Sequence, residues 1–177
     1  MALILSLAEQ QAIKSIGGLN NANTVAESKY TELAFEVERN EITKLIGDEL
    51  YQDIVQNPAN YVDLLEGSTF TYCDRQKNHY GLKYIIAYLN YDRWAKSGHI
   101  NDTMTGMVEK KRPDSEPISK GDRKNNSTFY RQIAMEGWKL TQQFLNTNSS
   151  YYPLWCPTEA NKRRKTPVIT SIRKTAR

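Results

Sequence analysis

Histidine, cysteine and clustered glutamate are the side chains of this sequence whose chemistry could support catalysis or metal binding. His79 and His99 each lack a neighbouring nucleophile or carboxylate in the sequence, so we expect both at the surface or at a helix end. Cys73 stands between Tyr72 and Asp74 without a basic neighbour that would favour a thiolate, and we expect it to be buried or half-buried. These residues are not spaced for nucleophilic or acid–base catalysis.

Glutamates provide the only plausible carboxylate metal cluster, and four of them are close in sequence: Glu32, Glu36, Glu38 and Glu41. Glu32 and Glu36 are one helical turn apart, as in the carboxylate metal sites of helical bundles. Those sites also need a Glu-x-x-His pattern from partner helices, which this sequence lacks. We therefore interpret the glutamates as a solvated acidic helix face.

Short motifs of common enzyme families are also missing. The sequence has no GxxxxGK[ST] or GxGxxG phosphate loop, no HExxH and no GxSxG. Cys73 and Cys156 lie far apart without zinc-ligand spacing, which predicts neither a disulfide framework nor a zinc site. We expect a protein that is not an enzyme and that holds no metal or cofactor.

Length and composition predict one globular domain with appendages. The chain has 177 residues, of which 39% are hydrophobic and 25% are charged, and this is enough for one core. No window approaches the roughly eighteen apolar residues of a membrane span. The apolar run at the start of MALILSLAEQQ is short, has no positive charge before it and is followed at once by Glu9, which argues against a secretory signal. We expect no membrane association.

Apolar residues recur at three- and four-residue steps, which predicts helices over residues 6–17, 28–47, 48–56, 76–96 and 127–146. The segment 76–96 is the most apolar, and Leu82, Ile85, Ile86 and Leu89 form one stripe of an expected central helix. In the last helix Phe129 is expected to share the core face. VDLLEG could add a turn, and STFTY alternates like a strand. The sequence predicts a mainly α fold: a small helical bundle with a long extended loop or β-hairpin insertion and an extended C-terminal tail.

An arm at about residues 99–120 interrupts the helices of the expected domain, residues 1–146. Prolines in its segment TGMVEKKRPDSEPIS forbid a continuous helix. Met107-Val108 and Pro117-Ile118 flank the charged tip KKRPDSE, which predicts a long hairpin that reaches another subunit; a solvated loop is the alternative. Its mixed charges suit ion pairs between proteins better than phosphate contacts. The residues expected at an inter-subunit contact are Met107, Val108, Lys110, Lys111, Arg112, Asp114, Glu116 and Ile118.

Residues 147–177 are expected to form an extended basic tail. From residue 157 onward seven basic residues stand against one acid, a net charge of +6, which leaves −2 for the rest of the chain. Large apolar side chains precede this basic stretch in a segment with no predicted element to bury them, and such anchors carry interface energy; folding back on the core is the alternative. The run PVITSI could augment a partner's sheet. The expected partner-binding residues are Tyr151, Tyr152, Leu154, Trp155, Lys162, Arg163, Arg164, Lys165, Arg173 and Lys174.

The order of these features resembles the head-to-tail connector (adaptor, ring or neck) proteins of tailed bacteriophages, and within them the ring proteins of crAss-like phages. The similarity spans residues 6–146. It lies in the helix pair KYTELAFEVERNEITKLIGDELYQDIV, the central helix that ends in YDRWAKSG, the arm, and the final helix that begins near FYRQIAMEGW.

The resemblance implies a structural virion protein: a helical bundle repeated in a ring, usually a dodecamer, that docks on the portal vertex, joins head to tail and continues the DNA channel. It implies as partners further copies of the chain, the portal protein, neighbouring connector or tail proteins, and genomic DNA in the lumen. The implied location is the neck of the virion, after synthesis in the bacterial host cytoplasm. The alternative suggested by charge is a nucleic-acid-binding helical protein that uses its basic C-terminal tail.

Overall fold

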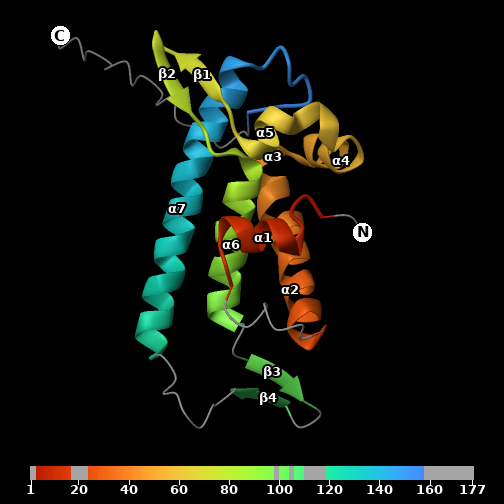
Figure 1. The fold of residues 1–177 in the computed structure, drawn as a ribbon, viewed down its shortest axis with the longest axis vertical. Helices are drawn as coiled ribbons and strands as arrows, with labels where there is room; N and C mark the ends of the chain where they lie inside the picture. Colours follow the sequence, from red (N-terminus) through yellow and green to blue (C-terminus); the bar gives the residue numbers. More distant parts are fainter. Residues whose placement is uncertain (1–2, 17–23, 98–99, 104–105, 110–118, 158–177) are drawn as a thin grey trace, which may run out of the picture.

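The structure is a computed structural model that describes residues 3–16, 24–97, 100–103, 106–109 and 119–157. The mainly α fold that the sequence predicts is confirmed (Figure 1). In chain order the elements are α1 (Leu7–Ile13), α2 (Thr24–Val37), the π-helix η1 (Glu38–Ile42), α3 (Thr43–Ile46), α4 (Asp48–Gln56), the 3₁₀ helix η2 (Pro58–Tyr61), α5 (Val62–Glu66), β1 (Thr69–Tyr72), β2 (Arg75–Asn78), α6 (Gly81–Ser97), β3 (Ile100–Thr103), β4 (Gly106–Glu109) and α7 (Lys120–Thr147).

Serine caps fix the starts of two of these helices. Ser6 accepts a hydrogen bond from the backbone N–H of Glu9 (3.3 Å), and the Glu9 carboxylate accepts one from the backbone N–H of Ser6 (2.8 Å). This reciprocal pair satisfies donors that a helix N-terminus leaves unpaired. Ser119 similarly accepts from the backbone N–H of Asp122 at 3.1 Å, at the start of α7. The long helix α7 therefore begins seven residues before its predicted start at 127 because a cap is present there.

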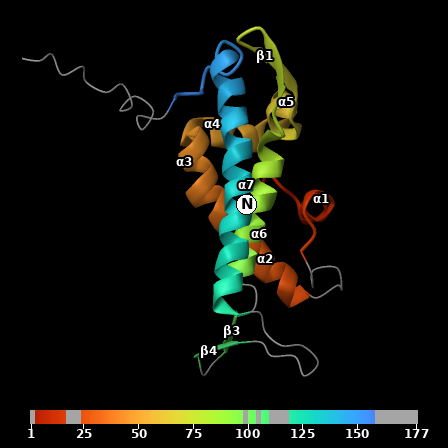
Figure 2. The ribbon, with the colours of Figure 1, turned by 90° about the vertical axis from the view of Figure 1, so that its left-hand side faces the viewer.

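Helix α6 lies at the centre of the bundle, with α7 along one side and α2 along the other (Figure 1). The view in Figure 2 shows α1 and α3 on opposite sides of the α6–α7 pair. The predicted stripe of α6 is confirmed, since its members are at most 1% exposed: Leu82, Ile85, Ile86 and Leu89. Within the described residues, none of the helices combines the length and apolarity needed to cross a membrane.

The hairpin β1–β2 replaces the first turn of the predicted helix 76–96. Cys73 and Asp74 form its two-residue turn, both with positive φ (49° and 59°), as a tight hairpin turn requires. Helix α6 starts at Gly81, where φ is 80° and an added Cβ would collide with the backbone of Leu65 and Gly67. Only glycine tolerates this combination of conformation and close approach. The helix expected from residue 76 is therefore wrong in its first five residues.

A second hairpin, β3–β4, extends beyond the end of the bundle (Figure 1). Its register pairs Asn101 with Val108 and Asp102 with Met107. The arm contains a hairpin, but Met107-Val108 pairs with β3 in it, a pairing that the sequence did not predict. Two residues connect β3 to β4. Closing this short loop costs less conformational entropy than closing a loop that contains the long charged tip. Pro117-Ile118 lies outside the described residues.

Candidate interaction site

The large side chains expected to anchor a partner are divided between the core and the surface. Tyr152 and Trp155 are 7% and 5% exposed, and Leu154 packs against the same core. Trp155 packs on Trp138 with ring centroids 6.0 Å apart, and its indole N–H donates to Asn146 Oδ1 at 3.0 Å. Tyr151 is 81% exposed.

The alternative, in which these residues fold back on the core, is therefore confirmed for Tyr152, Leu154 and Trp155, and the core extends past the expected domain boundary at residue 146. Turns after α7 explain the difference: the N–H of Tyr151 donates to Asn148 O, and the N–H of Trp155 donates to Tyr152 O. These bonds fold residues 148–157 back onto the bundle.

Two of the remaining predicted interface residues, Met107 and Val108, lie in β4. The other arm residues and the basic tail residues lie outside the described part of the chain: Lys110, Lys111, Arg112, Asp114, Glu116 and Ile118 in the arm, and Lys162, Arg163, Arg164, Lys165, Arg173 and Lys174 in the tail.

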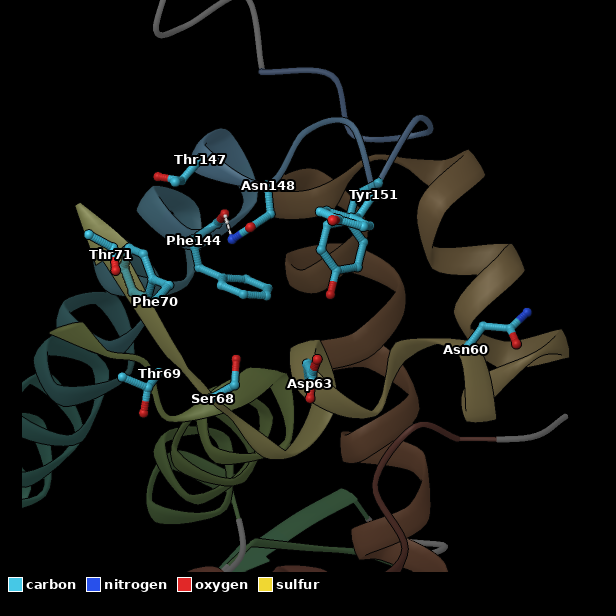
Figure 3. A pocket seen from close by; sticks show the side chains of 11 residues that line it. Asn60, Asp63, Ser68, Thr69, Phe70, Thr71, Phe144, Thr147, Asn148 and Tyr151 are labelled. Atoms are coloured by element: carbon cyan, nitrogen blue, oxygen red, sulfur yellow. Dashed lines mark hydrogen bonds between the residues drawn. The ribbon is translucent and has the colours of Figure 1, made fainter. Parts of the chain in front are cut away.

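A groove of about 840 Å³ lies between β1 and the turn that follows α7 (Figure 3). Aromatic rings form part of its wall, and hydroxyl and amide side chains surround them. Its lining residues are Asn60, Asp63, Ser68, Thr69, Phe70, Thr71, Phe144, Thr147, Asn148, Tyr151 and Tyr152. Asp63 is the charged residue of this lining, so the groove is weakly acidic. Burial, together with the Asp63 carboxylate, raises the pKa of Tyr152.

His79 lies next to this groove, two residues before the start of α6, and is 3% exposed. Of the two positions expected for it, the surface or a helix end, the surface position is therefore wrong. Its ring stacks on Phe144 with centroids 4.1 Å apart. The backbone N–H of Gly81 donates to Nδ1 (3.3 Å), so the proton of the neutral ring is on Nε2, which lies 3.1 Å from Ser68 Oγ. Nε2–H therefore donates to the Ser68 hydroxyl, the opposite of what a general base needs. Burial lowers the pKa of His79 to about 4.

Glu38 contradicts the predicted solvated acidic face because it is completely buried in η1. Its carboxylate accepts hydrogen bonds from the backbone N–H groups of Ile4 (3.0 Å) and Leu5 (3.2 Å) and from the Tyr51 hydroxyl (3.1 Å). Burial raises its pKa. Glu38 thus holds the segment before α1 against the bundle.

The other glutamates of this group are surface or ion-pair residues. Glu32 and Glu36 are exposed, as expected. Glu41 pairs with Arg93 (3.0 Å) and Arg131 (2.7 Å), and so joins η1 to α6 and α7. The part of the chain that the structure describes contains no cluster of three metal-ligating side chains.

A row of aromatic rings begins just before α6 and continues along α6 to α7, and the sequence did not predict that these rings contact one another. Tyr80, Tyr84 and Tyr88 follow one another at 4.9 and 4.6 Å, and the row continues to Tyr130. The four-residue spacing of tyrosines was the available signal. Phe129, predicted in the core, is 55% exposed, because the buried face of α7 follows Ala134, Trp138, Thr141 and Leu145.

The two cysteines, Cys73 and Cys156, are both free and exposed. The buried or half-buried position predicted for Cys73 is wrong, because the residue occupies the turn at the tip of the β1–β2 hairpin.

The sequence of the chain matches one described family over more than half of its length. The matching model is that of a family of unknown function, DUF6712, and it covers residues 42–165, from the end of η1 through α7 into the tail. No curated protein and no solved structure matches the chain. The chain therefore belongs to the DUF6712 family.

Proposed function

We propose that this protein is a structural ring component of a phage virion, which joins the head to the tail at the portal vertex and continues the DNA channel. The observation that carries the proposal is the position of the β3–β4 hairpin. It extends past the end of the bundle, and within the described residues no helix makes more than marginal contact with it (Figure 1).

An isolated two-stranded hairpin is at best marginally stable in water. Its strands have outer edges with unpaired N–H and C=O groups, and pairing or packing against another chain satisfies them. A hairpin that its own bundle does not support is therefore suited to contact a neighbouring copy. The order of elements agrees with the resemblance to connector proteins, because the hairpin interrupts the chain between the central and the last long helix.

The two long sides of the bundle also differ in charge. Without the buried Glu38 and the Glu41–Arg131 ion pair, helix α7 has four basic and two acidic residues, whereas residues 24–56, from α2 to α4, have six acidic and three basic residues. These elements lie on opposite sides of α6 (Figure 1). Opposite charge on two different sides favours a head-to-tail contact between copies, and such contacts close into a ring when the rotation divides the circle.

The experiment that tests the proposal removes the charged segment of the arm that follows β4 in the sequence. Deletion of KKRPDSE, residues 110–116, is expected to reduce ring formation while the helical content stays unchanged. The matched control replaces the same seven residues by glycine and serine, which keeps the length and removes the charges. Ring assembly is measured by sedimentation velocity and electron microscopy, and helicity by circular dichroism. Complete rings from the deletion variant would refute the role of the arm.

A further inference from the structure

Strand β1 has one hydrogen-bonding edge that no strand of the described chain covers. β1 and β2 form a sheet of only these two strands, and the N–H of His79 donates to Ser68 O at 3.1 Å. Hydrogen-bonded and non-hydrogen-bonded pairs alternate along an antiparallel ladder. With Ser68 in a bonded pair, Thr69 and Thr71 direct their peptide N–H and C=O groups away from β2.

The groove described above follows this edge. Successive side chains of a strand point to opposite faces, so a groove on one face is lined by every second residue. Here four consecutive residues line it: Ser68, Thr69, Phe70 and Thr71. The opposite wall is formed by Thr147, Asn148 and Tyr151 (Figure 3). An exposed edge inside a walled groove suits an extended peptide that adds a strand.

We propose that residues 167–172 (PVITSI) of a second copy bind in this groove as a strand beside β1. The segment contains Val168, Ile169 and Ile172, residue types that favour strands. The basic run KRRK precedes it, and Asp63 is the charged residue among those that line the groove. Charge and β propensity therefore both match the site. The inference deepens the proposed function, because it names a contact by which adjacent copies are joined.

The tail begins beside the groove of its own copy, at a fixed point. Trp155 is anchored to α7, and Tyr151, four residues earlier, lines the groove. Nine residues, 158–166, separate the last described residue from PVITSI and span up to about 30 Å when extended. A bundle of three helices is about 20–25 Å across, so this spacer reaches an adjacent copy.

A second copy is favoured over the chain's own groove by the charge of the spacer. Its four consecutive basic residues repel one another, and such repulsion favours an extended chain. Binding in the same copy requires the spacer to reverse direction beside the groove it has just left. Binding in an adjacent copy uses the extended form.

Cross-linking between two full-length variants tests the proposal. Both carry Cys73→Ser and Cys156→Ser. One copy adds Thr147→Cys at the rim of the groove, and the other adds Ser171→Cys in the tail. With a short bismaleimide, the mixture is expected to give a yield of cross-linked dimer at least tenfold higher than a control mixture. In the control, Glu32→Cys, at an exposed position of α2, replaces the groove cysteine. A dimer yield equal to that of the control would overturn the proposal. So would a variant that carries both cysteines on one chain, if cross-links formed only within that chain at high dilution and never between copies.

Proline substitutions then test the strand geometry in the same cross-linking assay. Thr71→Pro removes an outward N–H of β1, and the loss is expected to lower the yield about tenfold, equivalent to about 1.4 kcal/mol. Gln76→Pro removes the corresponding N–H on the outer edge of β2, away from the groove, and should leave the yield within about twofold.

Tail variants keep the test independent of the fold of the bundle. Ile169→Pro should abolish the cross-link, whereas Thr175→Pro, beyond the segment, should not. Equal yields from these two variants would overturn the inference. Rings without this cross-link would refute the tail contact alone, and the cross-link in dimers that never close into rings would refute the proposed function alone.

Discussion

Replacing Trp155 by alanine distinguishes a core residue from an interface anchor. The side chain is 5% exposed and packs on Trp138. A buried tryptophan removes about 200 Å² from water, which at about 25 cal/mol/Å² corresponds to about 5 kcal/mol as an upper value. The hydrogen bond adds little, because Asn146 is exposed and its amide can bind water instead. We expect Trp155→Ala to lower the free energy of unfolding by about 3–5 kcal/mol.

Urea unfolding followed by circular dichroism measures this loss. With a denaturant dependence of about 2 kcal/mol/M, the midpoint should fall by about 1.5–2.5 M. Tyr151→Ala is the matched control, since Tyr151 is 81% exposed, and its effect should stay within about 0.5 kcal/mol. If Trp155→Ala unfolded at the same urea concentration as the unchanged protein, the assignment of residues 148–157 to the core would be refuted.

Three further predictions concern the buried polar groups and the tail. The free energy of unfolding should fall as the pH decreases from 6.5 to about 4, because the pKa of His79 is lowered to about 4 in the folded chain and only the unfolded chain gains the proton over this window. Urea titrations at pH 7 and pH 5 measure this fall, which should be smaller for His79→Gln than for the unchanged protein. An equal fall in both proteins would contradict the assignment to His79. Glu38→Ala leaves the N–H groups of Ile4 and Leu5 without their acceptor. Hydrogen exchange in α1 should therefore accelerate, and the free energy of opening this helix should fall by at least about 2 kcal/mol. If Glu38→Ala and Glu38→Gln protected α1 equally, the carboxylate would not be what holds this segment. Duplex DNA should bind the full chain without a steep salt dependence; strong low-salt affinity that disappears on deletion of residues 158–177 would favour the nucleic-acid-binding alternative.

Local signals explain which parts of the fold could be predicted. The cap at Ser6, the break at Gly47 and the apolar stripe of α6 are each encoded within a few residues, and the structure has all of them. Strand β2 was missed because its sequence, RQKN, has no apolar alternation and its residues are largely exposed. Its pairing depends on the turn at Cys73 and Asp74 rather than on its own residues.

The candidate site depends on contacts between residues that are distant in sequence. Glu38 is buried by residues 33 and 34 positions away, and His79 contacts Thr141, 62 positions away. The groove combines α5, β1 and the turn after α7, none of which carries a motif. The aromatic residues after α7 were recognised as anchors, but sequence could not show that their own bundle supplies the surface they pack on.

Electron microscopy of the purified full-length chain, alone and mixed with a portal protein from the same genome, shows whether the chain forms rings. We expect closed rings that stack on the portal with the arms at the seams between copies, and incomplete or absent rings when residues 110–116 are deleted. Single bundles that never associate with each other or with the portal, under conditions where the portal itself is assembled, would contradict it.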